Sequence, residues 1–167
     1  MQFQTQVAKQ TSALRIALAG MLSLAVVMGL GRFAFTPLMP MMLHEARINL
    51  QQASWLASAN YFGYLLGAIL CMLQPIVWKR YQLHPLSSAR MVRIALITIA
   101  CLTALMANDS SVSWTYLRFI TGCMTAIGFV YTSSWCLAHL AQRNASTTGG
   151  IIYAGPGVGI AVSGLFA

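Results

Sequence analysis

Charged residues are almost absent from long stretches of this chain, and their absence limits what it can fold into. Only 7% of the 167 residues are charged, whereas 58% are hydrophobic. A run of about 20 apolar residues is long enough to cross the hydrocarbon core of a bilayer. Backbone polar groups inside a bilayer must bond to one another, so each such run is expected to form a helix. The sequence therefore predicts an all-α membrane protein.

Short polar breaks divide the chain into about five transmembrane helices that follow a cytoplasmic N-terminal tail at residues 1–13. The helices form one transmembrane bundle over residues 14–167, with predicted spans at about 14–43, 53–77, 89–107, 112–141 and 148–167. The first span is too long for a cleaved signal peptide and longer than a bilayer requires. Pro37 and Pro40 predict a kink or an early end in it.

The loop charges predict an orientation. Seven basic residues lie beside the spans on one side of the predicted bundle: Lys9, Arg15, Lys79, Arg80, Arg90, Arg93 and Arg143. The loops on the other side carry Glu45, Arg47 and Asp109. Basic loops remain in the cytoplasm, so we expect a multi-pass protein of the bacterial inner membrane with a cytoplasmic N-terminus. This topology accounts for the net charge of +8, and no nucleic-acid partner is predicted.

The sequence offers no recognisable catalytic or metal-binding constellation. The four cysteines lie inside apolar runs and form no CxxC pair, which argues against disulfide and metal roles. The three histidines lack metal-ligand spacing, and neither a nucleophile–base pair nor a glycine-rich phosphate loop is recognisable. We therefore expect a protein that is not an enzyme and that uses no metal or cofactor.

Glycine is unevenly distributed along the chain, and two spans carry GxxxG pairs. Gly63 and Gly67 form one pair and Gly155 and Gly159 the other, with Pro156 beside Gly155. Small residues four apart let two helix backbones approach closely, either within one bundle or at a dimer face. Proline removes a backbone donor, so the second segment is expected to bend or unwind, as binding-site helices of transporters do, or to hold a static kink.

Polar side chains inside the spans are the candidates for a substrate cavity. Arg32 lies deep in the first span, and Asn60, Tyr61 and Arg118 lie at a comparable depth in the second and fourth. A charged side chain in hydrocarbon is costly and should face protein or water. No acidic residue lies in any span, so Arg32 is expected to meet a backbone carbonyl, an external anion or a carboxylate outside this chain, or to snorkel to the interface.

Several of these segments resemble transporters of the major facilitator superfamily. The residues 118–122 (RFITG) are similar to its RxxxG motif, and residues 154–159 (AGPGVG) to its GPxxG motif, which the family associates with proton-coupled antiporters. Residues 31–40 (GRFAFTPLMP) and 59–67 (ANYFGYLLG) resemble the YbfB/YjiJ-type branch more specifically. The loop between the second and third spans keeps the family's basic residues but lacks its usual Asp and Gly.

This resemblance implies an ion-coupled secondary transporter of a small organic solute or drug, working in the lipid bilayer. Carriers of this fold use two halves of six helices each, about twelve in all. A chain with five spans is therefore expected to be a fragment, which either lacks a C-terminal half or self-associates. The alternative is a non-transporting membrane scaffold, or a truncated remnant, that packs with partner helices.

Overall fold

The computed structural model describes residues 2–82, 84, 86–106 and 111–165, and these residues form helices and short connections without a strand. The helical segments follow in order as α1 (Gln2–Leu24), η1 (Ala25–Phe33), α2 (Phe35–His44), α3 (Leu50–Arg80), α4 (Ser88–Met106), α5 (Ser111–Ala141), η2 (Ser146–Ala154) and α6 (Gly155–Leu165). Five stretches are long and apolar enough to cross a membrane: Ser12–His44, Leu50–Arg80, Ser88–Met106, Ser113–Ala141 and Ser146–Leu165. The predicted all-α membrane fold with about five spans is confirmed.

Several helix ends differ from those that hydropathy suggested. α3 begins at Leu50, three residues before the predicted span, because Asn49 and Gln52 form a capping box. The Gln52 amide donates to Asn49 Oδ1 at 2.8 Å, and the Asn49 amide donates to Gln52 Oε1 at 2.9 Å. The predicted N-terminal tail is helical from Gln2 onward as the first turns of α1. Residue 107, the loop residue Asp109 and residues 166–167 lie outside the described part of the chain.

The first span is interrupted before its prolines. A π-helix, η1, runs from Ala25 to Phe33, and α2 then continues past Pro40 to His44. The span therefore has no early end, and its irregular part precedes Pro37. A π-helix is a rare, wider form that is often found at functional sites. Here it carries Arg32 in its last turn.

Close glycine contacts join α3 to α5. A Cβ atom added to Gly63 would overlap the backbone carbonyl of Phe119, and one added to Gly67 would lie 2.5 Å from the carbonyl oxygen of Cys123. From the other side, a Cβ atom on Gly122 would overlap the carbonyl of Asn60. Small residues permit this approach of two backbones, which is how membrane helices pack without a hydrophobic driving force.

The second GxxxG pair joins the last span to the first. Cβ atoms on Gly155 and Gly159 would overlap the carbonyls of Met21 and Ala25, and Gly159 also meets Gly29 of η1. Both glycine pairs are thus occupied by helices of the same chain. Span five changes its geometry beside Pro156, from the 3-10 helix η2 to α6, and the proline sits in the first turn of α6, where its missing donor is tolerated.

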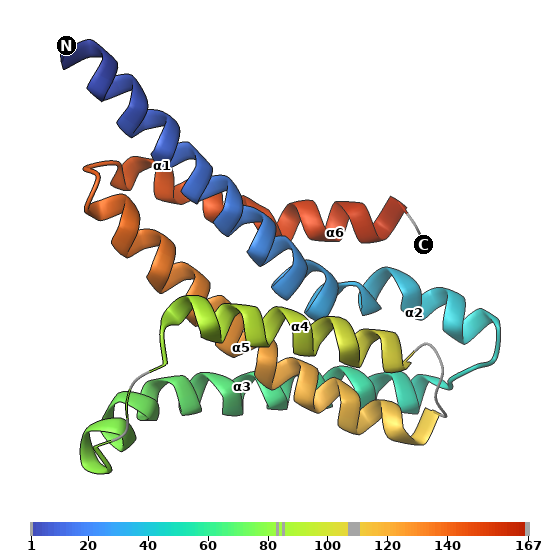
Figure 1. The fold of residues 1–167 in the computed structure, drawn as a ribbon. Helices are drawn as coiled ribbons and strands as arrows, with labels where there is room; N and C mark the ends of the chain where they lie inside the picture. The colour runs from blue at the N-terminus through green and yellow to red at the C-terminus, as the bar shows by residue number, and fades with distance from the viewer. Residues whose placement is uncertain (1, 83, 85, 107–110, 166–167) are drawn as a thin grey trace.

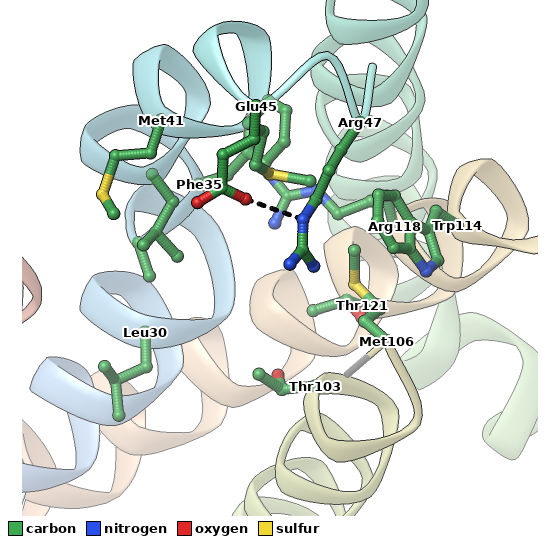
Figure 2. Close-up of a pocket in the computed structure, with 13 residues that line it drawn as sticks. Leu30, Phe35, Met41, Glu45, Arg47, Thr103, Met106, Trp114, Arg118 and Thr121 are labelled. Carbon is green, nitrogen blue, oxygen red and sulfur yellow. Dashed lines mark ion pairs between the residues drawn. The ribbon is translucent and has the colours of Figure 1, made fainter. Parts of the chain in front are cut away.

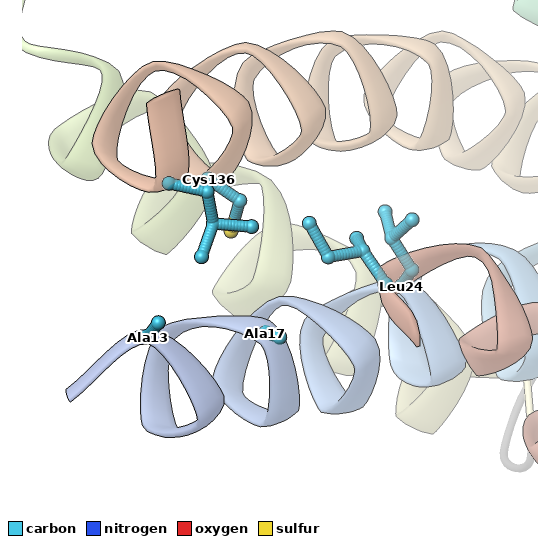
Figure 3. Packing of buried hydrophobic residues seen from close by; sticks show 6 residues of the cluster. Ala13, Ala17, Leu24 and Cys136 are labelled. Carbon is cyan, nitrogen blue, oxygen red and sulfur yellow. The ribbon is translucent and has the colours of Figure 1, made fainter. Parts of the chain in front are cut away.

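A small apolar core lies where α1, α5 and η2 converge (Figure 3). Its buried members are Ala13, Ala17, Leu24, Cys136, Leu140 and Ile152. Most other large apolar side chains face outward, for example Leu65, Met72 and Ile97, which are 54%, 70% and 64% exposed. Exposed apolar surface on this scale suits contact with lipid rather than with water.

Most basic residues of the described chain gather toward one end of the bundle. The end of α3, the start of α4 and the end of α5 lie toward one end with the start of α1, and α2, the start of α5 and the end of α4 lie toward the other (Figure 1). The first end carries Lys79, Arg80, Arg90, Arg93 and Arg143, whereas Glu45 and Arg47 lie at the second. A cytoplasmic N-terminus stays a prediction from this asymmetry.

Candidate functional site

The contact between α3 and α5 brings two of the predicted cavity residues together. Asn60 is 2% exposed, and its Nδ2 donates a hydrogen bond to the backbone carbonyl of Arg118 at 3.0 Å. Gly122 permits this spacing because it has no Cβ to push the Asn60 backbone away. Asn60 therefore helps to set the position of Arg118 through the backbone.

The Arg118 side chain crosses toward the first span. Its Nη2 donates to the carbonyl oxygen of Arg32 at 3.4 Å, and its guanidinium carbon lies 4.7 Å from the centre of the Phe35 ring. The residue is 6% exposed, and its Nε is buried with no hydrogen-bond partner among the described residues. A buried donor of this kind is costly when it is left unpaired.

The π-helix helps to explain why the Arg32 carbonyl accepts this bond. In a π-helix a carbonyl bonds to the amide five residues later, and that position after Arg32 is Pro37, which has no N–H. The irregular backbone can therefore offer the oxygen to Arg118. Irregular backbone at membrane depth is tolerated where it is buried in protein or lines a cavity.

The Arg32 side chain lies over two aromatic rings of α3 and near that of its neighbour Phe33. Its guanidinium carbon lies 4.1 Å from the ring centre of Tyr64, 4.8 Å from that of Tyr61 and 5.6 Å from that of Phe33. Cation–π contacts of this kind stabilise a desolvated guanidinium by about 0.5–2 kcal/mol. Tyr64 was missed by the sequence reasoning, although Tyr61 and Tyr64 are three residues apart and so share a helix face.

A cavity of about 400 Å³ lies between α2, the end of α4 and the start of α5 (Figure 2). Its lining consists of Leu30, Ala34, Phe35, Leu38, Met41, Met42, Glu45, Arg47, Thr103, Met106, Trp114, Arg118 and Thr121. Of the four predicted cavity residues, Arg118 lines it, whereas Arg32, Asn60 and Tyr61 are not among the lining residues. The cavity has the size typical of small-molecule sites.

Three lining residues that share one face of α5 define the polar side of the cavity. Trp114, Arg118 and Thr121 follow one another at helical spacing. The Trp114 Nε1 is buried and, within the described residues, has no hydrogen-bond partner. The sequence reasoning missed Trp114 and Thr121, which the same spacing could have placed beside Arg118.

The charges around the cavity are unbalanced. Glu45 and Arg47 form an ion pair at 2.7 Å, with side chains 49% and 66% exposed (Figure 2). Within the described residues neither Arg32 nor Arg118 pairs with a carboxylate. The site therefore holds a buried cation whose Nε has no acceptor, beside an exposed pair that is already neutral.

A smaller cavity of about 290 Å³ lies toward the basic end. It includes Arg93 from α4, Gly20 from α1 and Thr132 from α5, whose hydroxyl is buried without a partner in the described chain. Neighbouring Trp135 and His139 stack with ring centres 4.2 Å apart. Across the described residues, no three His, Cys, Asp or Glu side chains gather as a metal site would require.

Comparison with known proteins agrees with the membrane-spanning architecture. A family model described as the uncharacterised MFS-type transporter YbfB matches residues 24–167. No curated protein and no solved structure gives a significant match. The matched stretch includes the π-helix, the cavity between α2, α4 and α5, and both glycine pairs. The chain belongs to the family of uncharacterised MFS-type transporters of the YbfB type.

Proposed function

We propose that this chain provides the solute-binding part of an ion-coupled secondary transporter for small organic molecules, acting together with further helices. Family membership supports transport in general. The observation that carries the finer proposal is the cavity beside Arg118: it has the volume of a small solute and a buried cationic group with a free donor. A permanent structural role for Arg118 alone would not require an adjacent cavity.

The proposal assigns different roles to the four polar residues. Arg118 contacts the solute, and Asn60 holds the Arg118 backbone in place. Arg32 offers its carbonyl to Arg118 and is itself held on the rings of Tyr61 and Tyr64. Gly155, Pro156 and Gly159 lie where the last span changes its helical geometry and packs against the first span. Bending at this point would change how the two spans pack together. The N-terminus is proposed to face the cytoplasm of a bacterial cell.

Transport is tested in inverted membrane vesicles from cells that produce the protein. A panel of organic acids, amines and neutral drugs is offered with and without an imposed proton gradient. We expect saturable, gradient-dependent accumulation of at least one solute, and its loss in Arg118→Gln. Arg93→Gln, which removes the same charge outside the cavity, is the matched control. Absence of gradient-dependent flux for every class would overturn the transport proposal.

The alternative is a non-transporting scaffold that packs with partner helices. One observation favours it: Gly157 and Gly164 lie seven residues apart on α6, and a Cβ atom on either would meet nothing within 4 Å. An open glycine face can accept another helix. Crosslinking in native membranes distinguishes a scaffold from a transporter when Gly157→Leu is compared with the unaltered protein. Loss of a crosslinked complex without any associated flux would favour the scaffold.

A further inference from the structure

We propose that the cavity beside Arg118 selects organic monoanions, namely a single carboxylate attached to an apolar body. This inference rests on the proposed function, since it names the class of solute for the same cavity. Its observations are two buried donors without partners, the composition of the surrounding walls and the neutral ion pair at the rim.

Two unpaired donors lie beneath the cavity wall on one face of α5. Arg118 Nε and Trp114 Nε1 are both buried, both lack an acceptor within the described residues and both belong to residues that line the cavity. Four residues separate them, so they are neighbours on the helix. A carboxylate has two acceptor oxygens and can satisfy both donors once the two side chains turn toward the cavity, and a charge-assisted bond to arginine is the stronger kind. A neutral amide offers a single, uncharged acceptor.

The remaining wall suits an apolar body of variable shape. Leu30, Phe35 and Leu38 come from the first span, as do the methionines Met41 and Met42, and Met106 comes from α4. Methionine is unbranched and flexible, so it adapts to different apolar shapes. The cavity is therefore expected to select the charged group of the solute strictly and the shape of its apolar part only loosely.

The rim argues for one negative charge rather than two. Arg47 is the other cation in the lining, but Glu45 already occupies it at 2.7 Å. A second carboxylate on the solute would have to displace Glu45 or lie beside it, and like charges repel. A cationic solute would instead face the buried guanidinium of Arg118. Monoanions are therefore favoured over dianions, cations and neutral analogues.

Binding is measured with the purified full chain in nanodiscs, with no ion gradient, using radiolabelled phenylacetate and naphthoate as the probes. Competitors matched to phenylacetate are phenylacetamide, which is neutral, and phenylmalonate, which is a dianion. We expect saturable binding of a probe and at least ~10-fold weaker competition by both analogues, since a bond to a charged group contributes about 1.5–3 kcal/mol. Arg118→Lys keeps the charge but loses Nε, and should weaken binding ~10-fold.

Trp114→Phe keeps the ring and removes only the indole donor, so binding should weaken ~5-fold even if the Arg118 variant fails to fold. Arg93→Gln should leave binding unchanged. Absence of saturable binding of both probes above that of empty nanodiscs would overturn the inference, as would equal competition by phenylacetamide. Unchanged affinity in Trp114→Phe would do the same. Binding without flux in vesicles would leave the inference standing and refute the transport proposal. Flux of amines alone would support transport and overturn the inference that the cavity selects monoanions.

Discussion

Gly63→Ala is the smallest change that should separate α3 from α5. A Cβ atom at this position would overlap the carbonyl oxygen of Phe119, and would lie 2.9 Å from the Phe119 carbonyl carbon and 3.2 Å from the Cys123 amide nitrogen. All three are backbone atoms of α5, so no side chain can rotate away. The helices must move apart, and this movement would also stretch the bond between Asn60 and the Arg118 carbonyl.

The size of the effect follows from two opposing contributions. Overpacking in a well-filled interior costs about 1–3 kcal/mol, and the upper half applies here because backbone must shift. Alanine is favoured over glycine within a helix by about 0.8–1.0 kcal/mol. The net loss of stability should therefore be about 1–2 kcal/mol. Gly157→Ala is the matched control, because nothing lies within 4 Å of its added Cβ and only the helix-propensity gain remains.

Equilibrium unfolding in mixed detergent micelles, followed by tryptophan fluorescence, measures both variants. We expect Gly63→Ala to be less stable than the unaltered protein and Gly157→Ala to be equally or more stable, with about 2–3 kcal/mol between the two variants. Equal stabilities, or a more stable Gly63→Ala, would refute the packing of α3 against α5 that positions Arg118.

Three further predictions concern the polar layer and the orientation. Asn60→Leu removes an interhelical hydrogen bond and should cost about 0.6–1.5 kcal/mol in the same unfolding assay, with weakened binding of phenylacetate. Arg32→Lys retains the charge but loses the planar stack on Tyr64, so its unfolding free energy should fall by about 0.5–1 kcal/mol, and by more in Arg32→Gln. A reporter inserted at Gln82 should be active in the cytoplasm and one at the C-terminus only outside it; the reverse pattern would contradict the orientation taken from the loop charges.

Hydropathy was sufficient to predict the all-α fold and its five membrane-crossing helices, because burial of the backbone in lipid leaves few alternatives. The depth of Arg32, Asn60 and Arg118 could also be estimated, since each residue adds about 1.5 Å along a helix. The rotation of each helix about its axis could not be predicted from the sequence, because it depends on which helix faces pack together. Only the structure shows that Arg118 reaches the Arg32 carbonyl while the Arg32 guanidinium turns to Tyr64.

The π-helix and the cavity were beyond sequence reasoning for related reasons. The change at Ala25 leaves no mark on hydropathy, and within η1 Gly29 packs closely against Gly159, a contact that the sequence alone does not show. The cavity is bounded by the first span and the residues that follow it on one side, and by α4 and α5, much later in the chain, on the other. Trp114 lies near the start of the fourth predicted span, where interfacial aromatic residues are common, but its indole nitrogen is buried.

The central claim is that a solute binds in the cavity beside Arg118. The most direct test is whether a solute protects a thiol in that cavity from chemical modification. Thr103 is exposed and lines the cavity on α4, so Thr103→Cys in a chain whose four native cysteines are alanine places a thiol at the site. Ile97→Cys, on the outward face of α4, is the control, because a thiol in lipid does not form the reactive thiolate. We predict that a membrane-impermeant maleimide outside right-side-out vesicles modifies Thr103→Cys alone, and that phenylacetate slows this reaction. Absence of modification, or a rate that phenylacetate leaves unchanged, would contradict a solute site beside Arg118.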